Sequence, residues 1–124
     1  MAQKPETVFR MRVMPKFKEI PRSYWMSVQQ KGIFGSPDVL GCVNGIFISL
    51  EFKKDIKSKP TELQNYKKEK IAQSRGMAFI IYPENWQDIH AFLMEISECS
   101  HVHVAYSELK VLRNKIFNNP TKEN

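Results

Sequence analysis

Three ionisable residues near the middle of the chain have the types and spacing of a metal-dependent hydrolytic site. Asp38 follows a proline, and Glu51 and Lys53 stand two residues apart at the end of an apolar run. Two carboxylates suit a hard divalent cation, which binds oxygen and usually keeps waters and substrate phosphate oxygens as well. Such a cation supports phosphodiester hydrolysis, because it polarises the phosphoryl group and lowers the pKa of a bound water. A neighbouring lysine then orients that water or stabilises the developing charge.

A β-hairpin is the element that has to bring these residues together. Asn44-Gly45 lies between two apolar runs. This dipeptide favours a type I′ turn, because both central residues need positive φ. We therefore predict a hairpin in which residues 38–43 pair with residues 46–53. Side chains alternate along a strand, so one face of the second strand carries an unbroken apolar set for the core: Ile46, Ile48, Leu50 and Phe52.

The register of this hairpin predicts that the three ionisable side chains converge. Counting outward from a two-residue turn places Asp38 directly opposite Glu51, with Cβ atoms roughly 4.5–5.5 Å apart. Lys53 points to the same face as Glu51. The alternative is an aspartate in a turn and an exposed Glu-Lys pair, which is common and contributes little. We favour the site, because Glu51 interrupts an apolar strand where an unexplained carboxylate is costly.

Further elements are expected on both sides of the hairpin. Before the hairpin we expect a helix over residues 5–20 that Pro15 interrupts or ends early, a strand over 23–31 and a loop over 32–37. After it we expect a helix over 61–75, capped by Thr61 or Ser58 and with Gly76 at C′, and then a strand over 77–82 that is buried on both faces. The last expected elements are a helix over 85–97, a short strand over 101–106 and a helix over 108–117. This order predicts an α/β fold, with a mixed β-sheet flanked by helices. One domain spans 1–117, and 118–124 is a polar tail.

Apolar spacing predicts which side of each helix packs on the sheet. The expected faces are Phe9, Val13, Phe17 and Ile20 in the first helix, Leu63, Tyr66, Lys70 and Ile71 in the second, and Trp86, Ile89, Leu93 and Ile96 in the third. Trp86, Phe92 and Phe117 are interpreted as core residues rather than as surfaces for base stacking, although part of this apolar surface could also form a subunit interface.

The segment GSPDVLGCVNGIFISLEFKKD resembles the core of the PD-(D/E)XK nucleases. It is most similar to the VRR-NUC branch, which contains small stand-alone nucleases that are often phage-encoded. The matching residues occur in order as Gly35-Ser36-Pro37-Asp38, an Asn-Gly hairpin, Glu51-Phe52-Lys53 and Thr61-Glu62-Leu63-Gln64. Gly76 and an apolar strand follow, so the likeness covers residues 32–84. It implies a restriction-endonuclease-like fold.

The resemblance also implies roles for individual residues. Asp38 and Glu51 would bind Mg²⁺ or Mn²⁺ together with the carbonyl of Phe52. Lys53 would activate or orient the water, and Gln64 would complete the catalytic set at the edge of the site. Glu6 in the first helix would be a further metal ligand, although an acid in a first turn is also explained by the helix dipole.

The whole chain has a net charge of +6, and its positive charge is concentrated in the first two-thirds. Residues 1–31 hold seven Lys and Arg against two acids, and residues 52–75 hold eight against three. Residues 77–109 hold five acids and no Lys or Arg. If the basic segments share a face, that face suits phosphate. We expect DNA contacts from Lys31, Ser36, Lys54, Lys57 and Lys59.

The expected function is therefore a metal-dependent, structure-specific DNA endonuclease that resembles a Holliday junction resolvase. Such an enzyme acts on branched DNA as a homodimer, because two strands have to be cut symmetrically. One alternative is a nuclease that processes flaps, ends or single strands. Another is a DNA-binding module without catalysis, and the intact set of Asp38, Glu51 and Lys53 argues against that loss.

Other features of the sequence point to simpler explanations. His101 and His103 would share one face of a strand, but no third zinc ligand lies nearby. Cys42 and Cys99 are expected to be reduced and buried. No apolar run reaches the roughly 20 residues of a membrane span, and the first residues lack the apolar region of a secretory signal. We expect a cytoplasmic protein, in the host cell if phage-encoded.

Overall fold

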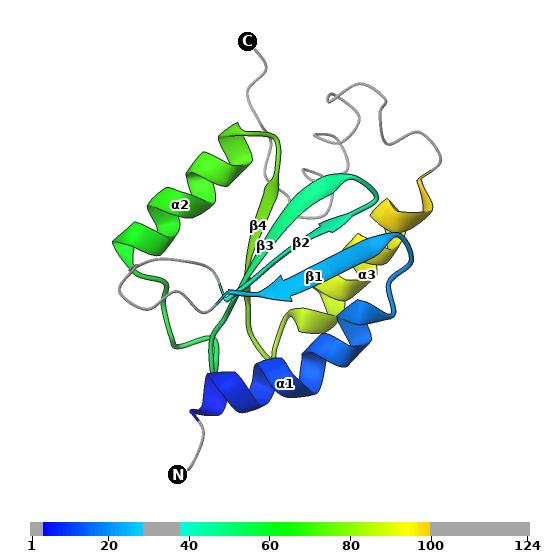
Figure 1. The fold of residues 1–124 in the computed structure, drawn as a ribbon. Coiled ribbons are helices and arrows are strands. Elements are labelled where there is room, and N and C mark those ends of the chain that lie inside the picture. Colours follow the sequence, from blue (N-terminus) through cyan, green and yellow to red (C-terminus); the bar gives the residue numbers. More distant parts are fainter. Residues whose placement is uncertain (1–3, 29–37, 100–124) are drawn as a thin grey trace.

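The computed structural model describes residues 4–28 and 38–99. In chain order the elements are α1 (Pro5–Lys18), β1 (Ser23–Ser27), β2 (Val39–Val43), β3 (Ile46–Phe52), α2 (Glu62–Gln73), β4 (Met77–Ile81) and α3 (Trp86–Glu98) (Figure 1). Several predictions fall outside the described residues: those for Lys31, Ser36, His101, His103 and Phe117, the strand over 101–106, the helix over 108–117 and the tail over 118–124.

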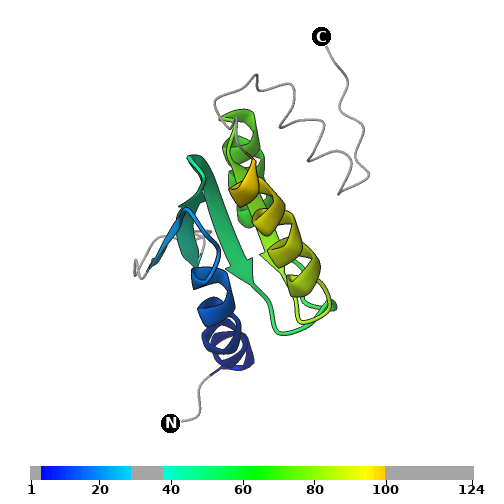
Figure 2. The ribbon, with the colours of Figure 1, turned by 90° about the vertical axis from the view of Figure 1, so that its right-hand side faces the viewer.

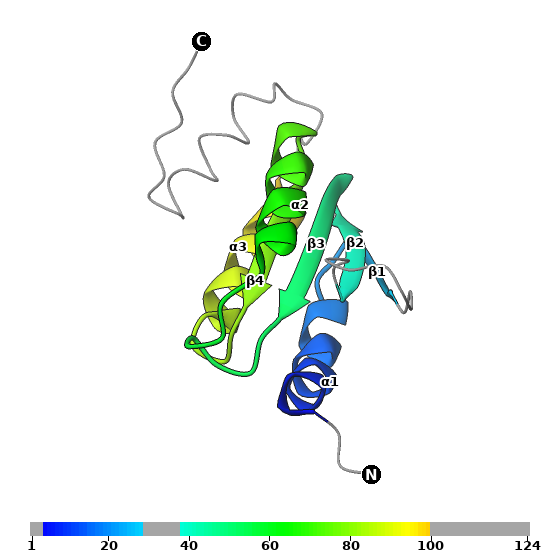
Figure 3. The ribbon, with the colours of Figure 1, turned by 90° about the vertical axis from the view of Figure 1, so that its left-hand side faces the viewer.

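The four strands form one mixed sheet in the order β1-β2-β3-β4. The β1-β2 and β2-β3 pairs are antiparallel, and β3-β4 is parallel. Near β4, helices α2 and α3 lie on opposite faces of the sheet: α3 is in front in Figure 2, and α2 is in front in Figure 3. The predicted α/β class, a mixed sheet flanked by helices, is confirmed. Within the described ranges no helix is long and apolar enough to cross a membrane.

The hairpin forms with the predicted turn and register. Asn44 and Gly45 have φ of 52° and 87°, as a type I′ turn requires. Val43 pairs with Ile46, and the antiparallel register continues to the last pair of the two strands, Val39 with Leu50. Because the register is fixed, the side chains of β3 divide cleanly between the core face and the opposite face.

The hairpin turn also holds the end of α3. The side-chain amide of Asn44 donates to the carbonyl oxygens of Ile96 and Cys99 at 2.9 Å each, and to that of Ser97 at 3.4 Å. The Arg22 guanidinium donates to the Ser97 carbonyl as well. Carbonyls in the last turn of a helix lack intrahelical partners, so these donors cap α3 from segments distant in sequence.

The core lies between the sheet and the two helices α1 and α3. Its members include the predicted apolar face of β3 and the predicted faces of α1 and α3, with Trp86 only half-buried at the edge. The rings of Phe9 in α1 and Phe52 in β3 meet edge to face, with centroids 5.5 Å apart. This contact places the first turns of α1 beside the end of β3. Phe92 is fully buried in the core, so it is not available for a subunit interface.

Helix α1 continues through Pro15, so the predicted interruption is wrong. A proline inside a helix removes the hydrogen bond to the carbonyl four residues earlier, which here is that of Met11. Both Pro15 and Met11 are exposed, so water can satisfy the carbonyl. The buried side chains Phe9, Val13 and Phe17 on the other side of the helix keep it packed on the core.

Helix α2 begins as predicted at Thr61, but it presents a different side to the sheet. Leu63 and Tyr66 are exposed, at 41% and 56%, and the Lys70 ammonium lies 5.6 Å from the centroid of the Tyr66 ring. Gln64 and Ile71 instead line the space between α2 and the strands. The predicted stripe is therefore correct only at Ile71 and wrong at Leu63, Tyr66 and Lys70, and the side chains of this helix are half-buried at most.

The end of α2 differs from the prediction at one residue. Arg75 rather than Gly76 has the left-handed conformation, with φ of 68°. The N–H groups of Gly76 and Arg75 donate to the carbonyls of Ile71 and Ala72, which is a Schellman arrangement with Arg75 at C′. Gly76 has a separate requirement, because a Cβ there would lie 3.0–3.1 Å from atoms of Ile71 and Phe47.

Two predictions of burial are wrong. Strand β4 alternates, since Met77, Phe79 and Ile81 are buried whereas Ala78 and Ile80 are half-buried. The latter two face α2, which covers that side only in part. The cysteines are free, but Cys42 is exposed and Cys99 is half-buried, because Cys42 points away from the core on β2.

Candidate functional site

Asp38 is fixed to β3 by its backbone and by its side chain. Its N–H donates to the Leu50 carbonyl at 3.0 Å, and its carbonyl accepts from the N–H of Val28 at 2.9 Å. These bonds continue the sheet one residue beyond β2. The last pair of the β2-β3 register is Val39 with Leu50, so the direct pairing of Asp38 with Glu51 stays a prediction, although the two side chains lie within hydrogen-bond distance. One carboxylate oxygen of Asp38, Oδ2, accepts from the N–H of Phe52 at 2.8 Å. The first acidic side chain of the site is thus held on the strand that carries the second.

Glu51 is a half-buried carboxyl group beside a second carboxyl group. The pKa of Glu51 is raised from 4.5 to about 8, chiefly by burial and then by the negative charge of Asp38 and a side-chain hydrogen bond between the two groups. Desolvation and a like charge both disfavour the ionised form. In the metal-free protein at neutral pH, the pair therefore holds a proton on Glu51.

Two cations oppose this rise in the pKa of Glu51, namely Lys53 and Arg10. Lys53 follows the end of β3 and is half-buried, and its charge acts on Glu51 as expected for a residue near that carboxyl group. Arg10 was not among the predicted site residues. It lies on α1 next to Phe9, whose ring packs on Phe52, and this packing brings the guanidinium near the acidic pair.

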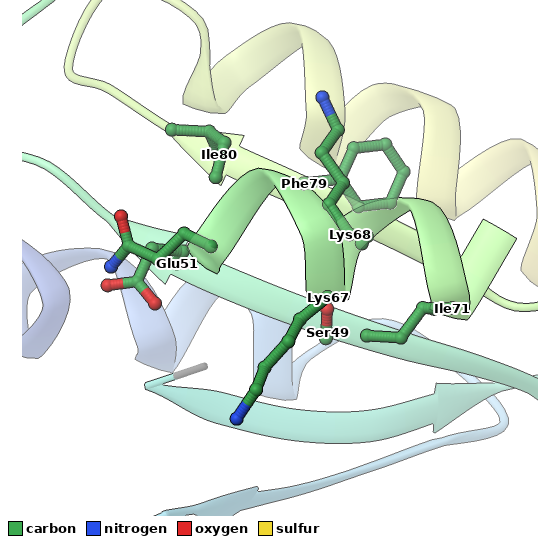
Figure 4. Close-up of a pocket in the computed structure, with 9 residues that line it drawn as sticks. Ser49, Glu51, Lys67, Lys68, Ile71, Phe79 and Ile80 are labelled. Atoms are coloured by element: carbon green, nitrogen blue, oxygen red, sulfur yellow. The ribbon is translucent and has the colours of Figure 1, made fainter. Parts of the chain in front are cut away.

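A pocket open to solvent adjoins Glu51 between α2 and strands β3 and β4. Its lining includes Ser49 and Glu51 from β3, Gln64 and Lys67 from α2, and Ile80 from β4. Figure 4 shows Lys67 extending from α2 across the sheet on the side of Glu51, while Lys68 points the opposite way. One wall of the candidate site is therefore cationic, and its floor is the sheet.

Gln64 reaches the edge of the site, but its side chain has a structural task. Its Oε1 accepts from the N–H of Thr61 at 2.9 Å, and the Thr61 hydroxyl accepts from the N–H of Gln64 at 3.1 Å. This reciprocal pair is a capping box, which starts α2. The T-x-x-Q motif therefore has a local structural explanation, and the catalytic role of Gln64 stays a prediction.

The donor set at the hairpin fits a magnesium-type cation. Two carboxylates are sufficient, because Mg²⁺ is usually bound through one or two of them together with waters and phosphate oxygens. Glu6 lies in the first turn of α1 and is half-buried. Across residues 4–28 and 38–99, no three Asp, Glu, His or Cys side chains are grouped closely enough to hold a metal. Glu6 is thus not gathered with Asp38 and Glu51, and its role as a ligand stays a prediction.

The loop after β3 presents the three lysines predicted to contact DNA. Lys54, Lys57 and Lys59 are exposed. Asp55 organises this loop, since its Oδ1 accepts from the N–H groups of Lys57 and Ser58 at 2.9 and 3.1 Å. Asp55 is therefore occupied in a turn rather than directed at the acidic pair.

Comparison with known proteins leaves this site to be interpreted from its own geometry. The chain matches no family model, no curated protein and no solved structure.

Proposed function

We propose that this chain is a metal-dependent, structure-specific DNA endonuclease that hydrolyses phosphodiester bonds, with a restriction-endonuclease-like fold and an action like that of a Holliday junction resolvase. The observation that carries the proposal is the Asp38–Glu51 pair, two neighbouring carboxyl groups at the open end of the β2-β3 hairpin. Burial and the nearby negative charge of Asp38 disfavour ionisation of Glu51 in the absence of a cation. A divalent metal would relieve that cost.

Each residue of the site would have a separate role in the reaction. Asp38, Glu51 and the carbonyl of Phe52 would hold Mg²⁺ or Mn²⁺, which polarises a phosphoryl group and lowers the pKa of a bound water. Lys53 would position that water or stabilise the charge that develops on the phosphate. Arg10, which approaches Glu51 from α1, would bind a phosphate oxygen of the substrate.

The charges around the site support a polyanionic substrate. The exposed Lys54, Lys57 and Lys59 follow β3 directly, Arg10 approaches from α1, and Lys67 forms part of the pocket wall. The acids of residues 77–99 lie on α3 and on the connection between β4 and α3. The basic side chains named above, rather than these acids, adjoin the carboxylates that would bind metal.

Cleavage of defined DNA structures tests the proposal. Purified protein would be offered a four-way junction, a flap, a duplex and a single strand, each with Mg²⁺, Mn²⁺ or EDTA. We expect metal-dependent cleavage that Asp38→Asn, Glu51→Gln and Lys53→Ala each abolish. Glu95→Gln, an exposed acid on α3, is the matched control and should cleave normally. Full activity of Glu51→Gln would exclude this site.

The resolvase part of the proposal requires two copies of the chain. A single active site cannot cut two strands of a junction in concert, whereas a two-fold pair presents its sites to symmetric strands. Sedimentation at micromolar protein should show a dimer. A monomer that cuts flaps or single strands faster than junctions would remove the resolvase assignment and leave the nuclease assignment standing.

A further inference from the structure

The side of the sheet that faces away from α1 and α3 carries an apolar surface next to the acidic pair. We call it the open face and define it by five side chains on β1, β2 and β3: Tyr24, Met26, Leu40, Cys42 and Phe47. Tyr24, Met26 and Phe47 are 66%, 53% and 45% exposed. In Figure 3, α2 lies alongside β4, and β3, β2 and β1 extend beyond it.

The open face leads directly into the candidate active site. Tyr24, Cys42 and Phe47 form one row across the sheet, and Met26, Leu40 and Ser49 form the next. The row after that contains the Asp38–Glu51 pair. Phe47 and Glu51 are four residues apart on β3, which corresponds to about 13 Å. That distance is roughly four nucleotide steps of a stacked strand, and fewer steps of an extended one.

The chemistry of the open face suits bases rather than phosphates. Its first two rows contain aromatic, aliphatic, thiol and hydroxyl groups, and charge on this face begins at the acidic pair. Lys67 extends along the same side of the sheet from α2 (Figure 4). An apolar strip with cations at its border offers stacking to bases and ion pairing to the backbone, which is the arrangement of surfaces that bind single strands.

The size of the open face argues against a second copy of the chain as its occupant. Stable protein interfaces bury about 20–30 residues on each side, and the open face has five side chains. An unpaired strand needs much less surface, because each stacked base contributes substantially by itself. A nucleic-acid strand whose phosphates are bound near the acidic pair would also have its neighbouring bases close to this surface.

We propose that the open face is a stacking surface for unpaired bases of the DNA strand that enters the site, with Tyr24 and Phe47 as the stacking side chains. This surface presupposes the nuclease function proposed above and specifies its substrate class. The substrate is DNA with unpaired nucleotides within about four steps of the cleaved phosphate, as at a flap, an overhang or a distorted branch point.

Binding in EDTA tests the surface without cleavage. The probe is a single-stranded oligonucleotide that contains 2-aminopurine, a base whose fluorescence is quenched on stacking, and a fully paired duplex of the same sequence is the comparison. Tyr24→Ala and Phe47→Ala should each weaken binding of the single strand about 5- to 100-fold and reduce the quenching. Duplex binding should change less than about twofold, because paired bases cannot stack on a side chain.

Matched variants separate stacking from loss of folding. Tyr24→Phe and Phe47→Tyr keep an aromatic ring and should bind the single strand normally. Tyr66→Ala removes a tyrosine of similar exposure, 56%, from the side of α2 that faces away from the pocket, and should have no effect. Glu51→Gln should lose cleavage but keep quenching.

The outcomes distinguish this inference from the nuclease proposal. Normal cleavage together with unchanged single-strand binding in Tyr24→Ala and Phe47→Ala would overturn the stacking surface alone. Absence of cleavage in the wild-type protein, with quenching that depends on Tyr24 and Phe47, would overturn the nuclease proposal alone. If the same two variants turned a dimer into a monomer without weakening single-strand binding, the open face would be a subunit interface instead.

Discussion

The Asp38 carboxylate accepts a hydrogen bond of 2.8 Å from the backbone N–H of Phe52, the residue that follows Glu51. The two acids of the site are therefore not equivalent. The backbone donor holds the Asp38 carboxylate in place, whereas Glu51 is desolvated and faces the negative charge of Asp38. One member of the pair is fixed in place, and the other has a raised pKa, so the proposed metal would have to displace a proton from Glu51.

Glu51 should make the metal-free protein less stable as pH rises. Its pKa is higher in the folded protein, at about 8, than its ordinary value of 4.5, so folding takes up a proton between these values and stability falls across this window. Across this window we expect the unfolding free energy of the wild type to fall by about 1–3 kcal/mol more than that of Glu51→Gln, after allowance for solvent screening. Urea unfolding at pH 5, 7 and 9 measures this difference. Glu95→Gln should follow the wild type, and parallel curves for all three proteins would contradict the assigned pKa.

Divalent metal should stabilise the folded chain in a manner that depends on pH. Only the folded hairpin brings Asp38 and Glu51 together, so Mg²⁺ or Mn²⁺ raises the melting temperature by mass action. A proton has to leave Glu51 when metal binds, so affinity should increase up to about tenfold per pH unit toward pH 8. Calorimetry in two buffers at pH 7 should detect release of close to one proton. The same thermal shift in Asp38→Asn/Glu51→Gln would place the metal elsewhere.

The lysines after β3 should contribute to DNA affinity without affecting the metal site. Changing Lys54, Lys57 or Lys59 to Gln removes an exposed charge and, if that lysine contacts a phosphate, should lower the slope of log affinity against log salt by about 0.9. The thermal shift with Mn²⁺ should be unchanged. Lys18→Gln is the control, because it lies roughly 12 Å along α1 from Arg10. If a variant with all three lysines changed to Gln kept the wild-type slope of log affinity against log salt, this loop would be excluded from the DNA-binding surface.

Asn44 should stabilise the protein in two separable ways. Its backbone adopts positive φ, and its amide caps α3 through the carbonyls of Ile96 and Cys99. Asn44→Gly keeps the backbone freedom and loses the cap, which should cost about 1–2 kcal/mol of unfolding free energy. Asn44→Ala loses both and should cost about 1 kcal/mol more. Chemical unfolding compares the two, and equal stability of Asn44→Gly and wild type would mean that the cap contributes nothing.

The hairpin and its acidic pair could be predicted because their geometry is local. A two-residue turn and the alternation of side chains determine which residues face each other across β2 and β3. Arg10 could not be placed in the same way, because its approach to Glu51 depends on how Phe9 packs against Phe52, more than forty positions away. The amide of Asn44 likewise meets carbonyls more than fifty residues later.

Helix α2 shows a different limit of sequence patterns. Spacing at Leu63 and Tyr66 indicated an apolar stripe, but an exposed stripe and a packed stripe have the same periodicity. The motif that begins this helix was predicted correctly as a structure, since Thr61 caps it. For the same reason the motif carries less weight for catalysis, because Thr61 and Gln64 satisfy each other's backbone N–H groups.

The shallow packing of α2 has a consequence for how the protein opens. Its most covered side chains are only half-buried, so detaching this helix exposes little apolar area compared with unfolding the sheet. Segments of this kind open locally at a free energy well below that of global unfolding. Amide protons of α2 should therefore exchange with solvent deuterium much faster than those of β3. If α2 opens in this way, the wall of the pocket that carries Gln64 and Lys67 would separate from Glu51 while the core stays folded, and the proposed DNA substrate would gain access to the acidic pair.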